Sequence, residues 1–100
     1  MRYKSARWKK KRLHILNLDG YEDVIERRYG RRTTANTVHH IYPADMYPQY
    51  RFEDWNLISV CQATHNKLEN RNTGELTELG LQLMKMTVPG VNWRIPPSKL

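Results

Sequence analysis

Apolar and polar positions alternate along the chain in short blocks, which predicts a mixture of short strands and helices. Residues 35–42 and 56–61 are rich in β-branched and other apolar side chains, and we expect two strands there. Several leucines within residues 75–86 predict a helix, although a glycine interrupts it. Residues 44–55 and 88–100 contain prolines and show no regular period, which is typical of a loop and an irregular tail.

A first helix is predicted near the start of the chain. Trp8, Leu13 and Leu16 would form its apolar face, and Ser5 is a suitable N-cap. An Asp-Gly pair at positions 19 and 20 then indicates a turn.

Two shorter helices complete the pattern. Residues 21–29 have acidic side chains early and arginines late, and Gly30 follows, an order that suits the helix dipole and a glycine cap. Residues 62–70 predict a helix directly after the second strand. The order of elements therefore predicts an α+β fold, in which a two-stranded antiparallel hairpin packs on a helix between flanking N-terminal and C-terminal helices.

A length of 100 residues indicates a single domain over 1–100. We divide it into a basic helical segment (1–32), a central strand-loop-strand-helix unit (33–71) and a C-terminal helix with its tail (72–100). The sequence contains neither a long apolar run nor a secretory signal, so no membrane association is predicted and we expect a cytoplasmic protein. Cys61 is the only cysteine, which excludes an internal disulfide.

Positive charge is concentrated in the first third of the chain. Residues 1–32 contain eleven Lys or Arg and four Asp or Glu, whereas residues 33–100 contain six of each. A concentrated positive field attracts polyanions, of which nucleic acid is the commonest. The alternative interpretation is a solvated face that keeps the protein soluble.

The central unit contains a group of residues that suits metal chemistry. His39 and His40 are adjacent near the end of the first strand, Asn56 opens the second, and His65 lies near the start of the following helix. Two strands folded onto a helix can bring these side chains together. Neighbouring residues on a strand point to opposite faces, so the two adjacent histidines would have different roles. Imidazoles from different elements are suitable ligands for a divalent cation.

These segments resemble the HNH endonucleases, the ββα-metal nuclease family. The matching stretches are VHHIYP (38–43), WNLISVC (55–61) and THNKLENR (64–71), with a similar upstream segment, LNLDGYEDVIERRYGRRTTANT. The resemblance covers roughly residues 8–71, and the chain looks like the small stand-alone HNH proteins of phages and prophages. It implies a host-cytoplasmic location if the protein is phage-encoded.

The resemblance also implies a role for each residue. His39 and His65 match the metal ligands, and His40 matches the general base that deprotonates the attacking water. Asn56 matches the asparagine that ties the loop between the strands and helps to orient the base. Some relatives have a third ligand one helical turn after the second, so we retain Glu69 as a further candidate. We expect one divalent ion, Mg²⁺ or Mn²⁺, with Ni²⁺ or Zn²⁺ as alternatives.

Structural zinc is not expected. Many relatives carry two Cys-x-x-Cys pairs beside the catalytic hairpin. Here Asp23 and Glu26 replace the first pair, and the second retains Cys61 but has Thr64 in place of the other cysteine. One thiolate cannot form a four-sulfur site. We therefore expect packing and polar contacts to replace the metal.

Four cations close to these segments are candidate contacts to DNA phosphates. Arg31 and Arg32 precede the first strand, and Lys67 and Arg71 belong to the helical segment that contains His65. Such contacts position a duplex without reading its sequence, so little sequence specificity is predicted.

The function predicted from the sequence is a metal-dependent DNA endonuclease that hydrolyses phosphodiester bonds. The alternative is a catalytically weak or inactive HNH scaffold that binds DNA and acts with a phage packaging partner. In that case the helix over 75–86 and the tail from residue 88 would be docking surfaces.

Overall fold

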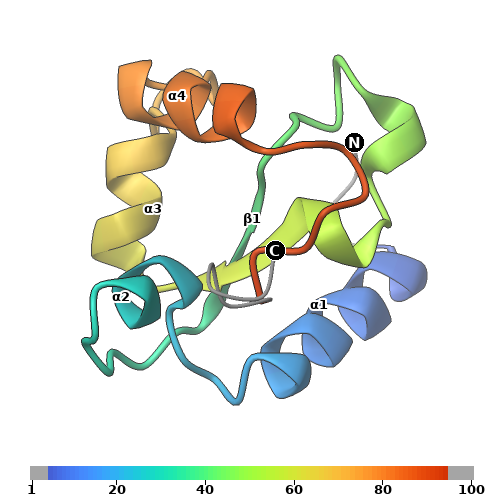
Figure 1. Cartoon of the computed structure of the whole chain (residues 1–100). Helices are drawn as coiled ribbons and strands as arrows, with labels where there is room; N and C mark the ends of the chain where they lie inside the picture. Colours follow the sequence, from blue (N-terminus) through green and yellow to red (C-terminus); the bar gives the residue numbers. More distant parts are fainter. Residues whose placement is uncertain (1–4, 95–100) are drawn as a thin grey trace.

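A short antiparallel hairpin lies at the centre of the computed structural model, which describes residues 5–94. Strand β1 (Thr37–His40) pairs with β2 (Leu57–Val60), and His39 lies opposite Ile58 while His40 lies opposite Leu57. Several helices surround this hairpin (Figure 1), which confirms the predicted α+β class. Residues 1–4 of the basic segment and 95–100 of the tail lie outside the described residues.

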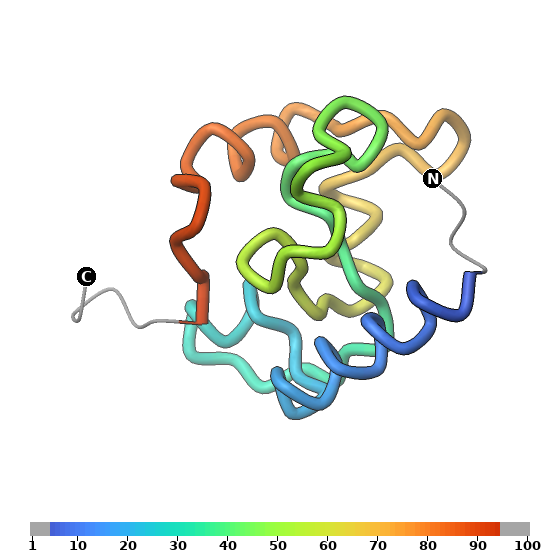
Figure 2. Tube along the Cα trace, turned by 90° about the vertical axis from the view of Figure 1, so that its right-hand side faces the viewer, coloured from blue at the N-terminus to red at the C-terminus, as the bar shows by residue number. Residues whose placement is uncertain are grey.

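Each face of the hairpin is covered by different helices. Helix α1 (Ala6–Leu18) packs on one face, where Trp8, Ile15, Leu16, Val38 and Leu57 form a buried cluster. The other face packs on α2 (Val24–Arg28), α3 (Gln62–Leu68) and α4 (Glu78–Met86). Its cluster is formed by Val24, Ile41, Ile58, Val60, Leu68 and Leu83. Helices α1 and α4 lie on opposite sides of the hairpin in both views (Figures 1 and 2).

The apolar face of α1 differs in part from the prediction. Ser5 caps the helix as expected, because its side chain accepts a hydrogen bond from the Trp8 backbone amide. Leu13, however, is half exposed, and Ile15 is buried in its place. At 3.6 residues per turn, Leu13 lies about 140° around the helix from Trp8, whereas Ile15 lies two turns further along the same face.

Helix α2 begins three residues later than predicted. Tyr21 has a left-handed backbone (φ 55°) and Glu22 forms an isolated bridge with Thr34, so neither residue is helical. Asp23 then caps the helix by accepting a hydrogen bond from the Glu26 amide. Gly30, with φ 77°, follows the helix end as predicted.

The boundaries of α3 and α4 also differ from the prediction. Helix α3 ends at Leu68, because the backbone of Glu69 is extended and pairs with Leu76. Helix α4 begins at Glu78, because Thr77 caps it through the amide of Gly80. Glu69 and Leu76, which were expected to be helical, therefore form a short antiparallel contact instead.

Gly80 marks a close approach between α3 and α4. A Cβ atom at this position would collide with the backbone carbonyl of Leu68. The glycine that interrupts the leucine pattern is therefore required by packing, since only a residue without a side chain allows the two helices to lie this close.

The two strands are shorter than predicted, and Asn56 is not part of one. The amide of Ile41 donates to the backbone carbonyl of Asn56, and the amide of Tyr42 donates to its side chain, so regular pairing stops after His40. Asn56 ends a 3₁₀ turn, η2 (Asp54–Asn56), and β2 starts one residue later. The intervening loop contains a second such turn, η1 (Pro48–Tyr50).

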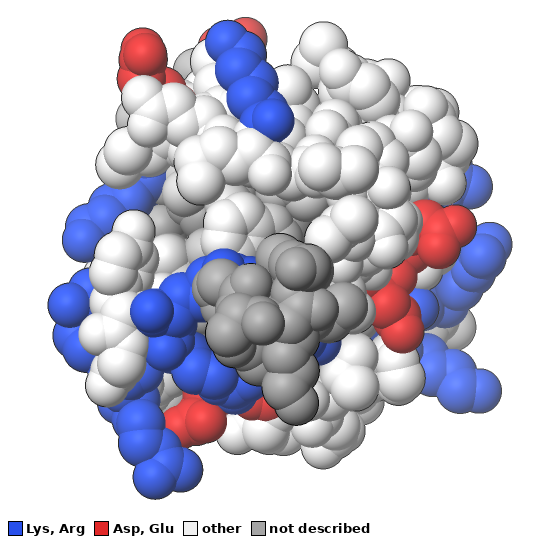
Figure 3. Space-filling view, viewed as in Figure 1, with Lys and Arg blue, Asp and Glu red and all other residues white. Residues whose placement is uncertain are grey.

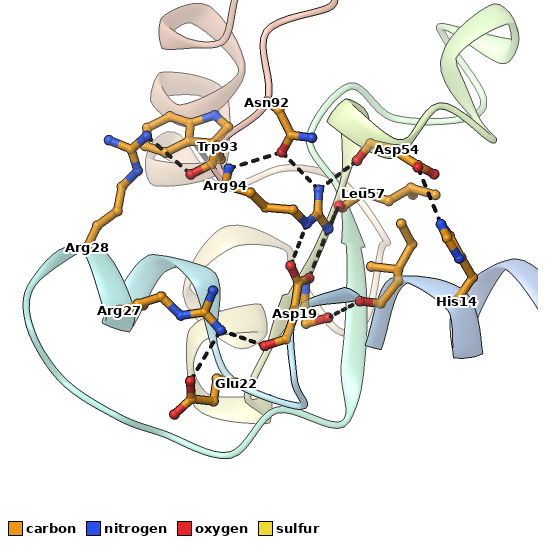
Figure 4. A network of polar contacts seen from close by, with 12 residues as sticks. His14, Asp19, Glu22, Arg27, Arg28, Asp54, Leu57, Asn92, Trp93 and Arg94 are labelled. Atoms are coloured by element: carbon orange, nitrogen blue, oxygen red, sulfur yellow. Dashed lines mark hydrogen bonds and ion pairs between the residues drawn. The ribbon is translucent and has the colours of Figure 1, made fainter. Parts of the chain in front are cut away.

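The segment after α4 packs into the fold as far as Arg94. The guanidinium of Arg94 forms a buried ion pair with Asp19 and donates to the carbonyls of Asp54 and Leu57 (Figure 4). Trp93 donates to Thr87 through its indole nitrogen. Trp93 and Arg94 therefore have contacts within the protein, and the docking role of the tail stays a prediction. No helix in residues 5–94 is long and apolar enough to span a membrane.

Candidate metal and catalytic site

His39 lies on the face of β1 that packs against α3. Its side chain is fully buried, and its ring lies edge-on to that of His65 with the centroids 5.5 Å apart. Neither ring nitrogen has a hydrogen-bond partner among residues 5–94. A buried polar atom without a partner needs a physical explanation, and a metal ligand is one of the few available.

Glu69 completes a group of three possible ligands with the two histidines. It follows His65 by one helical turn, and its Oε2 lies 3.4 Å from Nε2 of His65. One ligand atom from each of His39, His65 and Glu69 lies within 4.8 Å of the others, and no other such group occurs in the described part of the chain. Two imidazoles and a carboxylate suit a divalent cation such as Mn²⁺, so the residues present fit the expected ion.

Burial keeps the His39 imidazole neutral. Loss of hydration lowers the pKa of His39 to about 3, and the neighbouring charge of His65 acts in the same direction. A neutral imidazole has the lone pair that a metal ligand requires.

His40 points to the opposite face of the hairpin, toward α1. Its ring stacks on the indole of Trp8, with centroids 4.9 Å apart and planes inclined by 21°. Its Nε2 lies 3.2 Å from the backbone carbonyl of Arg51. A carbonyl only accepts, so Nε2 must carry the hydrogen, and Nδ1 is then the nitrogen that can accept a proton. Burial lowers the pKa of His40 to about 4, although the Arg51 carbonyl and nearby carboxylates oppose this shift.

Asn56 holds together the two ends of the loop that supports His40. Its side-chain oxygen accepts a hydrogen bond from the Tyr42 amide at 2.7 Å, and its side-chain nitrogen donates to the carbonyls of Tyr42 and Tyr50. Tyr50 directly precedes Arg51, whose carbonyl contacts His40. The asparagine is fully buried, so these bonds are not exchanged with water.

A pocket of about 240 Å³ runs along the open edge of β1. It is lined by Trp8, Arg12, Asn36, Thr37, Val38, His40, His65 and Glu69. Because β1 has a partner on only one side, its other edge lies between α1 and α3. The pocket therefore joins the two faces of the strand and places His40 beside two of the three possible metal ligands.

The sequence pattern does not identify Trp8 and Arg12 as lining residues of this pocket. It predicts Trp8 in the apolar face of the first helix and does not distinguish Arg12 from the other cations near the start of the chain. Their spacing of four residues places them on one face of a helix. That signal was present in the sequence, but nothing in it showed that this face would border the histidines.

The four predicted DNA contacts differ in their surroundings, and none lines the pocket. Arg31 forms an ion pair with Glu26, and Arg32 forms one with Glu22. Lys67 and Arg71 are exposed on and just after α3. Figure 3 shows basic side chains over the α1 and α2 regions, whereas the surface over α4 is mostly uncharged.

The positions that would hold structural zinc in relatives are connected here by hydrogen bonds. The carboxylate of Asp23 accepts from the amides of both Glu26 and Cys61, at 2.8 Å in each case. The sulfur of Cys61 lies 3.3 Å from the hydroxyl of Thr64. Asp23 thereby connects α2 directly to the end of β2 and the start of α3.

A comparison with solved structures gives a close match. No family model and no curated protein matches the chain. The crystal structure of an HNH endonuclease from the deep-sea thermophilic bacteriophage GVE2, with a manganese ion, matches it with a TM-score of 0.62 and 36% sequence identity. The match covers 64% of this chain and 70% of the phage protein. Together with the His39, His65 and Glu69 group, it shows that the chain belongs to the HNH endonuclease family.

Proposed function

We propose that this protein is a metal-dependent DNA endonuclease that hydrolyses phosphodiester bonds with little sequence specificity. The observation that carries the proposal is a single pocket in which His40 borders His65 and Glu69. The buried His39, whose ring nitrogens have no hydrogen-bond partner within residues 5–94, completes the ligand group. The ligand group would hold a cation that stabilises negative charge, and His40 would accept a proton. Hydrolysis of a phosphodiester requires both.

His39, His65 and Glu69 would hold one divalent ion, Mg²⁺ or Mn²⁺ in the cell, with Ni²⁺ or Zn²⁺ as alternatives. When bound, the ion neutralises charge that develops on the phosphate oxygens and on the leaving oxygen. Three protein ligands leave coordination positions available to the substrate and to water. Glu69 adds a negative charge to the group, so the three residues together should bind a divalent cation more tightly than the two histidines alone.

His40 is the proposed general base. It is neutral near pH 7, because burial lowers its pKa to about 4, so its Nδ1 can accept the proton of an attacking water. A bound phosphate would raise this pKa by its negative charge and strengthen the base when substrate is present. Asn56 is a proposed positioning residue, because its bonds to Tyr42 and Tyr50 fix the loop whose Arg51 carbonyl orients the imidazole.

Phosphates that flank the cleaved bond are proposed to contact Arg31, Arg32, Lys67 and Arg71. The side chain of Arg32 is 88% exposed, so a phosphate can approach it without burial of other groups. For a phage protein, this chemistry would take place in the cytoplasm of the host.

Plasmid cleavage tests the proposal directly. Supercoiled DNA incubated with the protein and Mn²⁺ should be nicked, and EDTA should abolish the reaction. His40→Ala should lower the rate by about 10² to 10⁴, the usual contribution of a general base. His14→Ala is the matched control, because His14 is exposed on α1, outside the pocket, and contacts Asp54.

Intact plasmid with the wild-type protein would contradict autonomous nuclease activity. If the protein then still retarded DNA in a gel, the alternative of a DNA-binding scaffold that acts with a packaging partner would be favoured. Nicking that survives His40→Ala would contradict the assignment of the base.

A further inference from the structure

We infer that duplex DNA is held at this site by Arg7, Arg12 and Arg51, which we call the arginine face. The inference rests on the proposed nuclease function and names the surface that receives its substrate. The three arginines come from α1 and from the loop between the strands. Arg12 lines the pocket with His40, and the backbone carbonyl of Arg51 contacts His40.

Arg12 is the member of the arginine face that reaches into the pocket. It lines the pocket together with His40, His65 and Glu69, and one of its terminal nitrogens, Nη2, donates to the backbone carbonyl of Asn36. That bond fixes the guanidinium and leaves its other N–H groups for a ligand, in the planar fork that suits phosphate oxygens. Glu69, the acidic residue of the pocket, belongs to the metal group. A phosphate at the cleavage position or beside it would therefore meet Arg12.

Arg7 and Arg51 are both held against the ring of Phe52. Their guanidinium carbons lie 3.9 Å and 5.4 Å from the centre of that ring. Stacking on an aromatic ring restricts the motion of a long side chain but does not neutralise its charge. Less conformational entropy is therefore lost when a phosphate binds. Arg51 is also the residue whose backbone carbonyl contacts His40.

The arginine face differs from most other arginines because its charges are not neutralised. Within residues 5–94, none of its three members forms an ion pair, whereas Arg27, Arg31, Arg32 and Arg94 all pair with carboxylates. A cation that already has a carboxylate partner adds little net field, and it must share or leave that partner to bind a phosphate. Within residues 5–94 the exposed Arg71 also has no ion pair, but among the arginines without one it is Arg12 that lines the pocket with His40.

The occupant that fits this surface is the backbone of duplex DNA. A fixed arginine in the pocket and two more beside it would contact successive phosphates, because a duplex presents negative charges at regular intervals. Such contacts position the duplex and carry no base information, in agreement with the low sequence specificity proposed above.

The salt dependence of binding tests the inference without any cleavage. A short labelled DNA duplex is titrated with the full chain in EDTA, at several KCl concentrations, and fluorescence anisotropy gives the association constant. Each phosphate contact contributes about 0.9 to the slope of log K against log salt. The variant with Arg7→Gln, Arg12→Gln and Arg51→Gln should therefore have a slope smaller by about 3. Circular dichroism establishes that the variant is folded.

The matched control has the same net charge and replaces cations outside both the arginine face and the proposed flanking contacts, with Lys11→Gln, Arg27→Gln and Lys85→Gln. Lys11 and Arg27 pair with Asp54 and Glu22, and Lys85 is exposed on α4. Its slope should fall by about 1 or less. An unchanged slope in the first variant, or an equal loss in the control, would overturn the inference. Tighter binding to an RNA duplex than to DNA would overturn the assigned occupant.

The result also separates the two proposals. If the triple variant has a smaller salt slope but the wild-type protein never nicks plasmid, the arginine face is supported and the nuclease function is contradicted. If the wild-type protein nicks plasmid but the triple variant keeps the wild-type slope, the nuclease function is supported and the arginine face is contradicted.

Discussion

The indole ring of Trp8 lies almost parallel to the imidazole ring of His40, with centroids 4.9 Å apart. Both side chains are buried. An aromatic face attracts a cation, so it would stabilise an imidazolium at His40, the state that the proposed general base would reach on accepting a proton. The same contact limits the rotation of the imidazole, whose Nε2 is held by the Arg51 carbonyl.

Replacement of the Trp8 ring should therefore affect turnover more than substrate binding. We expect Trp8→Phe to retain kcat within a few-fold and Trp8→Leu to lower it by about tenfold or more, since misplacement of a catalytic group is costly. KM should change little in either variant. Steady-state cleavage of a labelled duplex measures both constants, with thermal melting as the check on folding. Equal kcat values for the Phe and Leu variants would show that Trp8 only fills space.

Metal binding should stabilise the protein through Glu69 as well as the histidines. Mn²⁺ at about a hundred times its dissociation constant should add about 2.7 kcal/mol to the free energy of unfolding. Glu69→Gln keeps the shape but removes the charge, and should weaken Mn²⁺ binding by about tenfold or more. Isothermal titration calorimetry measures the affinity. Glu75→Gln, in an exposed turn outside the ligand group, should bind as the wild type does, and a similar loss there would indicate a general charge effect.

Acid should destabilise the metal-free protein over a defined pH range. The pKa values of His39 and His40 fall from 6.5 in the unfolded chain to about 3 and about 4 in the folded protein. The unfolded state therefore binds more protons than the folded state below pH 6.5. The contribution of the two neutral imidazoles to the free energy of unfolding is fully present above pH 6.5 and decreases as the pH falls toward their folded pKa values. Each histidine contributes a slope of up to about 1.4 kcal/mol per pH unit.

Urea unfolding in EDTA, repeated across that range, measures this dependence. His40→Gln should remove about half of the slope between pH 6 and 5, before most carboxylates titrate. A wild-type stability that is flat over this range would contradict the buried neutral state of both imidazoles.

Asp23 should contribute to stability in the way that a metal does in relatives with four cysteines. Its carboxylate accepts from two backbone amides, one at the start of α2 and one at Cys61. Asp23→Ala removes a helix cap and leaves the Cys61 amide without its partner, so a loss of about 2–3 kcal/mol is expected. Asp23→Asn, which keeps one acceptor oxygen, should lose less. Chemical denaturation distinguishes the two, and identical losses would contradict a role for both bonds.

The close contact at Gly80 connects helix packing to the metal group. Gly80→Ala would force α4 away from the Leu68 carbonyl, at a cost of about 1–3 kcal/mol. Because α3 carries His65, we also expect weaker Mn²⁺ binding in this variant. Gln82→Ala is exposed on α4 and should change neither quantity. If Gly80→Ala lowered the melting temperature but left metal affinity intact, the displacement would not reach α3.

The sequence predicts the centre of the site because its residues lie in short local motifs. His39 and His40 must face opposite ways on a strand, and His65 lies near the start of the helix that follows. The third candidate ligand, Glu69, follows from helical spacing, although the helix ends one residue before it. Local patterns thus predict which side chains converge. The predicted starts of α2 and α4 are each three residues too early, so the element boundaries are predicted less well.

Contacts between distant segments could not be predicted in this way. Nothing near Asp19 in the sequence indicates that its carboxylate is buried against Arg94, and nothing near Trp8 indicates that it packs on His40. These pairings depend on how helices and loops pack on the hairpin, which has no local period. The choice of Ile15 over Leu13 for the core shows the same dependence, because both are apolar and only the packed geometry distinguishes them.

The ion pair between Asp19 and Arg94 has a consequence for how the protein forms during synthesis. The two residues are 75 positions apart, and the guanidinium also binds the carbonyl of Leu57, at the start of β2. Until Arg94 has left the ribosome, the Asp19 carboxylate lacks this partner, and its burial would be unfavourable. The hairpin that carries His39 and His40 is therefore expected to reach its full stability only after residue 94 has been synthesised.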